Sequence, residues 1–235
     1  MNPMHYLDFQ PEWMVQGKYK DPDSCSFQLY QDIATRFQWE DALGVKPSVV
    51  HRANRYSLIL PVAGQTIKLG SDYFGPSICW AQKADVDWRS FIREARTLGG
   101  HVAWERRNGS VNQRRGGASG VFDRPDLTLY WLKQYFTNQP GPNGLLKAFA
   151  RDRFLKLFEN DFDRFIRFWK LDTFLDASTG QIVDLTTYDP STGNYQELLG
   201  EKDVKSQIPS DTEGYTRFVA GCTHAIDQRN ALIFS

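Results

Sequence analysis

The sequence predicts an α+β fold: a small, mostly antiparallel sheet packed by five or six helices. Several segments carry apolar residues three and four positions apart, which is the spacing of an amphipathic helix. Between them lie short apolar runs of strand length, and two of these are separated by only two residues. A chain of 235 residues suits one domain, which we assign to residues 1–235, with an irregular arm at 1–25.

The first half of the chain begins with a predicted helix from Ser26 that runs for about three turns. Residues 41–54 are expected to form a loop. Residues 55–62 and 65–69 are expected to form two strands of a hairpin, joined at Ala63-Gly64, and 70–76 a second loop. Asp87 is a candidate helix cap, and Gly99-Gly100 would end that helix.

The second half is expected to be mainly helical. A short strand at 101–104 precedes a helix that starts at Pro125, the residue favoured at the first helical position, and reaches Phe136. The other predicted elements are a helix over 145–158, a helix capped by Asp161, short extended pieces over 173–200 with turns at 178–180 and 191–193, and a helix from a Ser210–Glu213 capping box to about Leu232.

The composition excludes several classes of protein. Hydrophobic residues make up 41% of the chain, and 28 basic residues balance 28 acidic ones, so attraction to nucleic acid would need a local patch. No apolar run has the length of about 18 residues that a membrane helix needs, and no signal-peptide pattern is present. Three scattered cysteines are typical of a reduced protein. We therefore expect a cytoplasmic protein with no membrane partner and no obligate protein partner.

Residues 106–120 form the most informative segment, because they contain four arginines, four glycines and no acid. Backbone amides of glycine-rich loops approach phosphates closely, and guanidinium groups bind phosphate oxygens in pairs. The segment matches no standard phosphate-loop motif, and a solvated surface loop is the alternative. The candidate residues for binding DNA or phosphate are Arg106, Arg107, Arg114, Arg115 and Gly116.

Three polar residues in or just after this loop are candidate catalytic groups. A carboxylate at Asp123 or Asp126 could activate water or stabilise a cationic transition state, although helix capping and an ion pair with Arg124 would explain both. Asn112 could contact a base or position a water, although a turn residue is the simpler interpretation. Four further residues are candidates for a base-stacking or pocket role: Asp21, Asp72, Tyr73 and Phe74.

Metal and cofactor chemistry finds little support in the sequence. The four histidines are scattered, and neither a zinc-ligand spacing nor a zinc-deaminase signature is present. The G-x-S-x-G motif of α/β-hydrolases is also absent. We therefore expect no metal and no nucleotide cofactor. A magnesium-dependent nuclease that uses Asp21, Asp23 and Asp72 stays open as an alternative.

Two stretches resemble the signature of a bacterial family of unknown function. That pattern runs Asn-x-x-Arg-Gly, a short spacer, then Asp-Arg-Phe-Asp-Leu-Thr-Leu, and here the stretches are residues 112–116 and 122–129. Weaker matches lie at 20–23, at 69–72 and at Arg229-Asn230, so the resemblance covers roughly residues 20–232. Two residues depart from the pattern, namely Pro125 in place of Phe and Gly70 in place of Ser.

The resemblance implies that Asn112, Arg115, Asp123 and Asp126 belong to one site. Relatives of this kind are associated with bacterial defence against phage, including removal of modified bases from phage DNA. A DNA glycosylase must hold phosphates, extrude a nucleotide and cut the bond between base and sugar. The resulting expectation is a metal-independent DNA N-glycosylase. The alternatives are a non-catalytic module that binds nucleic acid or a nucleotide, and the nuclease above.

Overall fold

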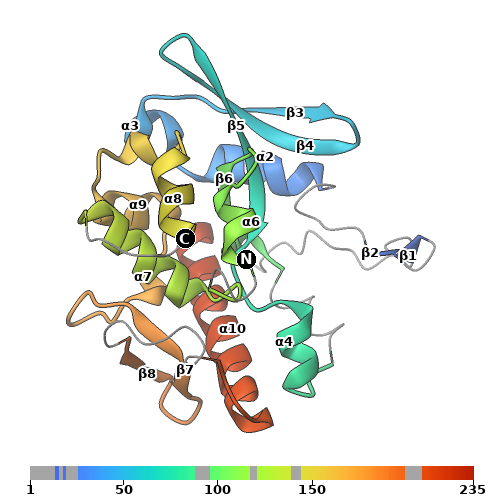
Figure 1. The fold of residues 1–235 in the computed structure, drawn as a ribbon, viewed down its shortest axis with the longest axis vertical. Coiled ribbons are helices and arrows are strands. Elements are labelled where there is room, and N and C mark those ends of the chain that lie inside the picture. Colours follow the sequence, from blue (N-terminus) through green and yellow to red (C-terminus); the bar gives the residue numbers. More distant parts are fainter. Residues whose placement is uncertain are drawn as a thin grey trace.

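The computed structural model describes residues 26–87, 96–116, 121–138, 144–198 and 208–235, and the backbone of β1 (Met14–Val15) and β2 (Lys18–Tyr19). Within these residues it confirms the α+β fold. A four-stranded antiparallel sheet and a two-stranded one are surrounded by helices (Figure 1).

The four-stranded sheet follows the order of the chain. It contains β3 (Ser48–Arg52), β4 (Arg55–Val62), β5 (Gln65–Tyr73) and β6 (His101–Glu105). The β4–β5 ladder ends at the pair Leu58 and Leu69, and the β5–β6 ladder begins at Leu69 and Glu105. Strand β5 therefore changes its partner at Leu69, and its second half lies beyond the β4 ladder.

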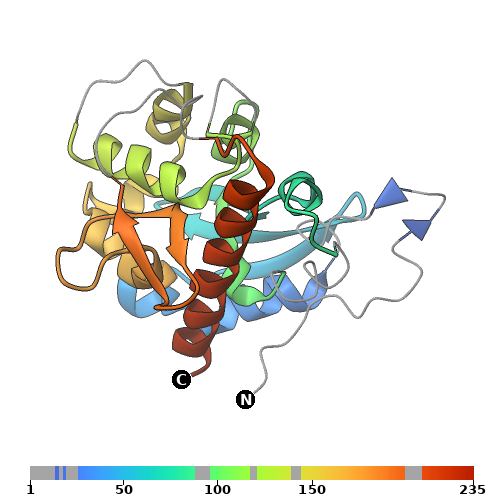
Figure 2. The ribbon, with the colours of Figure 1, turned by 90° about the horizontal axis from the view of Figure 1, so that it is seen from below.

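Helices cover both faces of this sheet. The helix α2 (Phe27–Arg36) packs against β3 and β4, and its start is capped by the Ser26 hydroxyl. Two shorter helices, α6 (Val111–Arg115) and α8 (Gly144–Arg151), lie together over the opposite face (Figure 2). The pocket described below lies on the α6 side.

Aromatic side chains form much of the core. The helix α9 (Phe162–Trp169) buries one face against α3 (Trp39–Leu43) and the short η3 (Leu155–Phe158). The rings of Trp39 and Phe168 meet edge to face, with centroids 4.9 Å apart. Such edge-to-face pairs add stability beyond the burial of their apolar area. The helix α7 (Pro125–Phe136) packs beside α8 and α9.

The long helix α10 (Thr212–Phe234) connects the remaining elements. It packs along β7 (Val183–Asp189), which pairs with β8 (Asn194–Glu197), and against α4 (Ile78–Lys83), η2 (Leu98–Gly100) and η4 (Asp172–Phe174). The fully buried Arg229 donates hydrogen bonds to the carbonyl oxygens of Gly99, His101 and Trp169. Burial lowers the pKa of Arg229 to about 9. No helix of the described residues is both long enough and apolar enough to cross a membrane.

Most of the predicted elements are confirmed. These are the helix that begins after Ser26, the hairpin β4–β5, strand β6, the helix that begins at Pro125, and the helix capped by Asp161. The turns at 178–180 and 191–193 are present as well. The helix expected after Asp87 falls largely on residues 88–95, which lie outside the described residues.

Several boundaries differ from the prediction, each for a local reason. Residues 41–54 are not a loop, because α3 continues to Leu43 and β3 pairs with β4. Residues 106–120 contain α6, whose start is capped by the Ser110 hydroxyl. The helix expected over 145–158 is interrupted at Asp152, whose carboxylate binds the backbone amides of Phe154 and Leu155. Asp211, not Ser210, caps α10.

Candidate functional site

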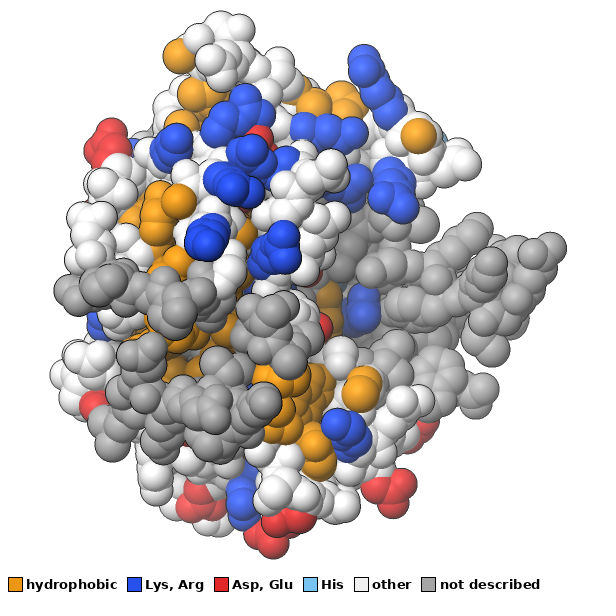
Figure 3. All heavy atoms as spheres, in the orientation of Figure 1, with side chains coloured by type: hydrophobic (Ala, Val, Ile, Leu, Met, Phe, Trp, Pro, Cys, Tyr) orange, Lys and Arg blue, Asp and Glu red, His pale blue; other side chains and the backbone are white. Residues whose placement is uncertain are grey.

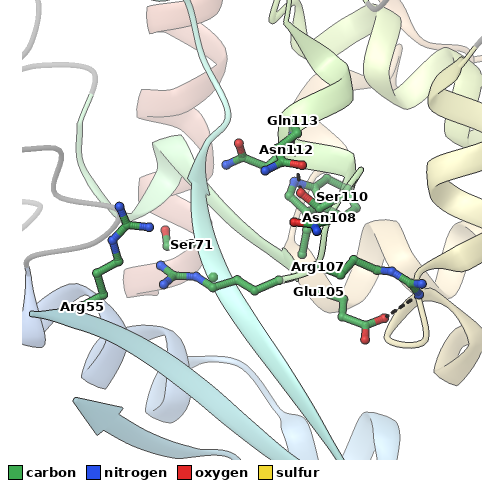
Figure 4. Close-up of a pocket in the computed structure, with 11 residues that line it drawn as sticks. Arg55, Ser71, Glu105, Arg107, Asn108, Ser110, Asn112 and Gln113 are labelled. Atoms are coloured by element: carbon green, nitrogen blue, oxygen red, sulfur yellow. Dashed lines mark hydrogen bonds and ion pairs between the residues drawn. The ribbon is translucent and has the colours of Figure 1, made fainter. Parts of the chain in front are cut away.

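A pocket of about 480 Å³ opens where β5 and β6 meet α6 (Figure 4). Its lining combines the start of β4, the paired strands and residues 106–113. The lining residues used below are Arg55, Ser71, Trp104, Arg106, Arg107 and Asn112. Residues 70–73 of the loop predicted at 70–76 are the end of β5 in the structure, and this strand places Asp72 behind the pocket wall.

Three arginines give the pocket its positive charge. Arg55 is exposed and reaches the pocket from β4 (Figure 4). Arg107 is also exposed, and one of its guanidinium nitrogens donates to the carbonyl oxygen of Arg151. Arg106 is half-buried, and its guanidinium donates to the Tyr30 hydroxyl at 2.9 Å. Arg55 and Arg107 retain N–H groups that a ligand could use, since a guanidinium has five.

The acid in the described pocket lining, Glu105, is shared between Arg153 and the pocket residue Arg107. Its side chain is buried, and its carboxylate accepts from the backbone amide and the Nε of Arg153, both at 2.7 Å. Arg107 lies 3.8 Å from it. Lysine and arginine side chains gather in the upper half of the view in Figure 3. We call the following residues the basic face: Arg55, Arg106, Arg107, Arg114, Arg151 and Arg153.

Behind the pocket, the buried Asp72 is held by donors on two sides. Its Oδ2 accepts from Trp104 Nε1 at 3.0 Å and pairs with an Arg115 guanidinium nitrogen at 2.5 Å. Its Oδ1 accepts from Asn112 Nδ2 at 2.8 Å. A carboxylate that accepts from three side chains fixes the positions of all three. Asp72 therefore positions Asn112 at the pocket wall.

Arg115 is a structural residue, although the sequence marked it as a candidate for phosphate binding. It is fully buried, and besides Asp72 it binds the Thr128 hydroxyl and the carbonyl oxygens of Tyr73 and Asp123. Its guanidinium also lies 4.8 Å from the centre of the Phe74 ring. This set of contacts anchors the end of α6 to β5 and leaves no face of Arg115 open to a phosphate.

Asp126 is likewise closed to solvent. Both of its oxygens are bound by the guanidinium of Arg124, and its carboxylate also accepts from the backbone amides of Leu127 and Leu185. Arg124 also pairs with Asp184 at 2.9 Å. Burial lowers the pKa of Arg124, but these two carboxylates raise it more, so that it lies above its ordinary value. The carboxylate of Asp126 therefore holds α7 against β7 and is not placed to act on a substrate.

Tyr73 and Phe74 are part of the core and not of the pocket lining. Tyr73 is 8% exposed and Phe74 is fully buried. Successive residues of a strand point to opposite faces, so Tyr73 points away from the face that Asp72 lines. Neither ring is open to stack on a base in this structure. Asp21 and Asp23 lie outside the described residues.

Asp123 is the candidate carboxylate that stays accessible. It is half-buried, and its side chain makes no hydrogen bond to the residues that the structure describes. It lies beside Gly116, in a turn where Phe122 and Asp123 both have positive φ angles, of 53° and 59°. Among non-glycine residues, aspartate adopts this left-handed conformation comparatively readily.

A further buried carboxylate, Asp152, links the pocket strand to the end of α8. It accepts from the Glu105 backbone amide and from two amides of the following turn. Burial raises the pKa of Asp152 to about 6, and the nearby charge of Glu105 adds to that rise, while these hydrogen bonds oppose it. This acid therefore changes its protonation state near neutral pH, directly behind the basic face.

The described residues contain no group of three or more histidine, cysteine or acidic side chains that could hold a metal ion. Of the aspartates that the nuclease alternative needs, the structure describes Asp72, whose oxygens already accept from Arg115, Trp104 and Asn112.

Two residues of the pocket escaped the sequence analysis. Arg55 and Trp104 reach the pocket from strands. The pairing of all the strands in the sheet could have identified Arg55. A prediction of one hairpin gives the pairing of only two of those strands.

Comparison with known proteins gives a family and nothing closer. No curated protein and no solved structure matches the chain. The model of a family of unknown function (DUF6994) matches residues 7–233, which is nearly the whole chain and contains every residue of the pocket. The chain therefore belongs to this family of unknown function, DUF6994.

Proposed function

We propose that the protein binds nucleic acid and holds its phosphates at the arginine-lined pocket. The observation that supports this most directly is the charge of the pocket. Three arginines line a pocket of about 480 Å³, and the one acid of its described lining, Glu105, is shared between Arg153 and Arg107. Guanidinium groups bind phosphate in pairs of hydrogen bonds, and the basic face around the pocket continues the positive charge for neighbouring phosphates.

The test is fluorescence anisotropy with labelled DNA, both duplex and single-stranded, at several salt concentrations. Replacing Arg55 and Arg107 with alanine should weaken binding at least about tenfold, since each phosphate contact adds about 1 kcal/mol or more. Arg217→Ala is the matched control, because Arg217 is an exposed arginine on α10 that pairs with Glu213. Equal losses in both variants would show only non-specific attraction, and no binding by the wild type would refute the proposal.

A second proposed function is hydrolysis of the bond between a base and its sugar, so that the DNA retains an abasic site. Asp123 supports it, because it is a half-buried carboxylate in a turn next to the end of the pocket helix. A fixed carboxylate stabilises the cationic sugar of such a reaction. Asn112 could orient the attacking water. Use of this activity in defence against phage is part of the same proposal and rests on the family resemblance.

This activity is tested on unmodified and phage-modified DNA in EDTA, with and without alkali. Strand breaks that need alkali but no metal would support the glycosylase. Asp123→Asn should abolish those breaks and leave DNA binding intact. Breaks that need added Mg²⁺ and no alkali would replace this proposal by the nuclease. Binding without breaks in every substrate would leave the protein as a binding module.

A further inference from the structure

Asn112 presents one fixed polar group to the pocket. Its amide nitrogen donates to Asp72 Oδ1 at 2.8 Å. Asp72 forms an ion pair with Arg115, so its carboxylate can accept but not donate. The orientation of the Asn112 amide is therefore determined: the nitrogen faces Asp72, and the carbonyl oxygen has no partner among the described residues.

The other amides of the pocket do not offer such an acceptor. The carbonyl oxygen of Gln113 accepts from the backbone amide of Gly109 at 2.8 Å. Asn108 is exposed, and no hydrogen bond to a described residue fixes its amide. The arginines supply donors only. Among the side-chain amides of the described lining, Asn112 is thus the one whose carbonyl oxygen is both oriented and unused, and it lies beside arginines that supply donors for an anion.

We propose that the Asn112 carbonyl oxygen binds the exocyclic amino group of a nucleobase, as carried by adenine, cytosine and guanine but not by thymine, while the arginines bind the phosphates. This inference rests on the proposed nucleic-acid binding and names the class of base that the pocket prefers. A pocket of about 480 Å³ lies in the size range of ordinary small-molecule sites and is large enough for one nucleotide.

The chemistry of the bases favours an amino group. An amino group projects from the corner of the base and has two N–H donors, so a single acceptor reaches it without opposition. The ring N–H of thymine lies between two carbonyl oxygens, and both would repel the Asn112 oxygen. A base that has no N–H donor leaves this oxygen desolvated and unpaired, which is costly in a pocket.

The experiment compares two single-stranded oligonucleotides of equal length: one of deoxyadenosine, and one of the purine deoxynucleoside that lacks the amino group. Both have the same phosphates and similar rings. Binding is measured by anisotropy at one fixed salt concentration. The wild type should bind the adenine strand about tenfold more tightly, which corresponds to one well-placed hydrogen bond.

Two variants show whether the preference comes from Asn112. Asn112→Ala should remove the preference, because it should weaken binding of the adenine strand and leave binding of the strand without amino groups unchanged. Gln113→Ala is the matched control on the same helix, and it should keep the ratio because the Gln113 carbonyl is already used by Gly109. Circular dichroism confirms that both variants fold, since residues 112 and 113 are exposed.

The outcomes separate this inference from the proposed function. Equal affinity of the wild type for the two strands, with binding still dependent on Arg55 and Arg107, would overturn the role of Asn112 and leave nucleic-acid binding in place. A preference that survives Asn112→Ala would overturn it as well. If the wild type binds neither strand and no duplex, both proposals fail together.

Discussion

At residue 70, the absence of a side chain lets Arg106 cross strand β5. A Cβ at this position would overlap the Arg106 side chain, whose guanidinium is held by the Tyr30 hydroxyl. The backbone of Gly70 has a negative φ, so glycine is needed here for space and not for a turn. The position of one pocket arginine thus depends on the smallest residue of the strand.

We expect Gly70→Ala to weaken DNA binding as much as Arg106→Ala does, by about tenfold, although it changes no charge. The methyl group would displace Arg106 from Tyr30 and from the pocket. The double variant should be no weaker than either single one, because both changes remove the same contact. Anisotropy measures the binding, and additive losses would contradict this explanation.

Asp152 gives the protein a pH-dependent stability. The pKa of its carboxyl rises from 3.8 to about 6 on folding, so between these values the folded state holds more protons than the unfolded one. Stability from this group is therefore present at low pH and decreases as the pH rises through this window, by about 3 kcal/mol. The advantage of the wild type over Asp152→Asn should shrink accordingly from about pH 4 to about pH 7.

Urea unfolding at a series of pH values measures this difference. Asp176→Asn is the control of opposite sign, because hydrogen bonds from Ser178 and Thr179 lower the pKa of the exposed Asp176. Its contribution is therefore present above the ordinary pKa of an aspartate and is lost as the pH falls. A pH-independent difference for Asp152→Asn would show that the carboxyl titrates normally in the folded protein.

At the scale of elements, the buried pair of Arg124 and Asp126 joins the first turn of α7 to strand β7. Asp126 accepts from the backbone amide of Leu185, and Arg124 also pairs with Asp184. Asp126→Ala leaves a buried guanidinium with one carboxylate fewer and an unpaired amide, so it should destabilise the fold by about 3–5 kcal/mol. Urea unfolding measures this loss.

Asp123→Ala is the matched comparison, since Asp123 precedes the same helix but its carboxylate has no described partner. It should change the free energy of unfolding by less than about 1 kcal/mol. If both variants were equally stable, the structural role assigned to Asp126 would be wrong, and its family motif would need a catalytic explanation.

The sequence predicted those elements whose signals are local. Asp161 caps α9 and Pro125 begins α7, as their side-chain chemistry favours at a helix start. The end of β5 was expected to be a loop, because Gly70, Ser71 and Asp72 have the composition of a turn. Pairing with β6 and the ion pair with Arg115 override that local preference.

The same contrast between local signals and contacts distant in sequence applies to the residues of the candidate site. Asn112, Arg106 and Arg107 were marked from one stretch of sequence, and all three line the pocket. Arg115 and Asp126 were marked from the same region, but partners distant in sequence bury them, and composition does not show which charges have such partners. Arg55 was missed because only the folded sheet brings it to the pocket.

At the scale of the whole molecule, a net charge of zero conceals an uneven distribution. DNA affinity should fall steeply with salt, with a slope of about −3 in a plot of log K against log salt for duplex DNA if three or four phosphates are neutralised. Arg114→Ala should reduce the size of that slope by about one. Arg217→Ala, outside the basic face, should leave it unchanged, and a flat plot for the wild type would contradict a phosphate-based mode of binding.

The helix α6 is anchored to the core by buried residues at both of its ends, and its middle residues are exposed to solvent. Val111 and Arg115 are buried anchors, while residues 112–114 between them are exposed. Positions 112 and 113 can therefore be exchanged with little effect on the core, and they include the acceptor proposed to choose the base. A library randomised only at these two positions would retain the scaffold and the arginines of the basic face. It offers a direct route to engineered variants with new base preferences, selected on immobilised oligonucleotides.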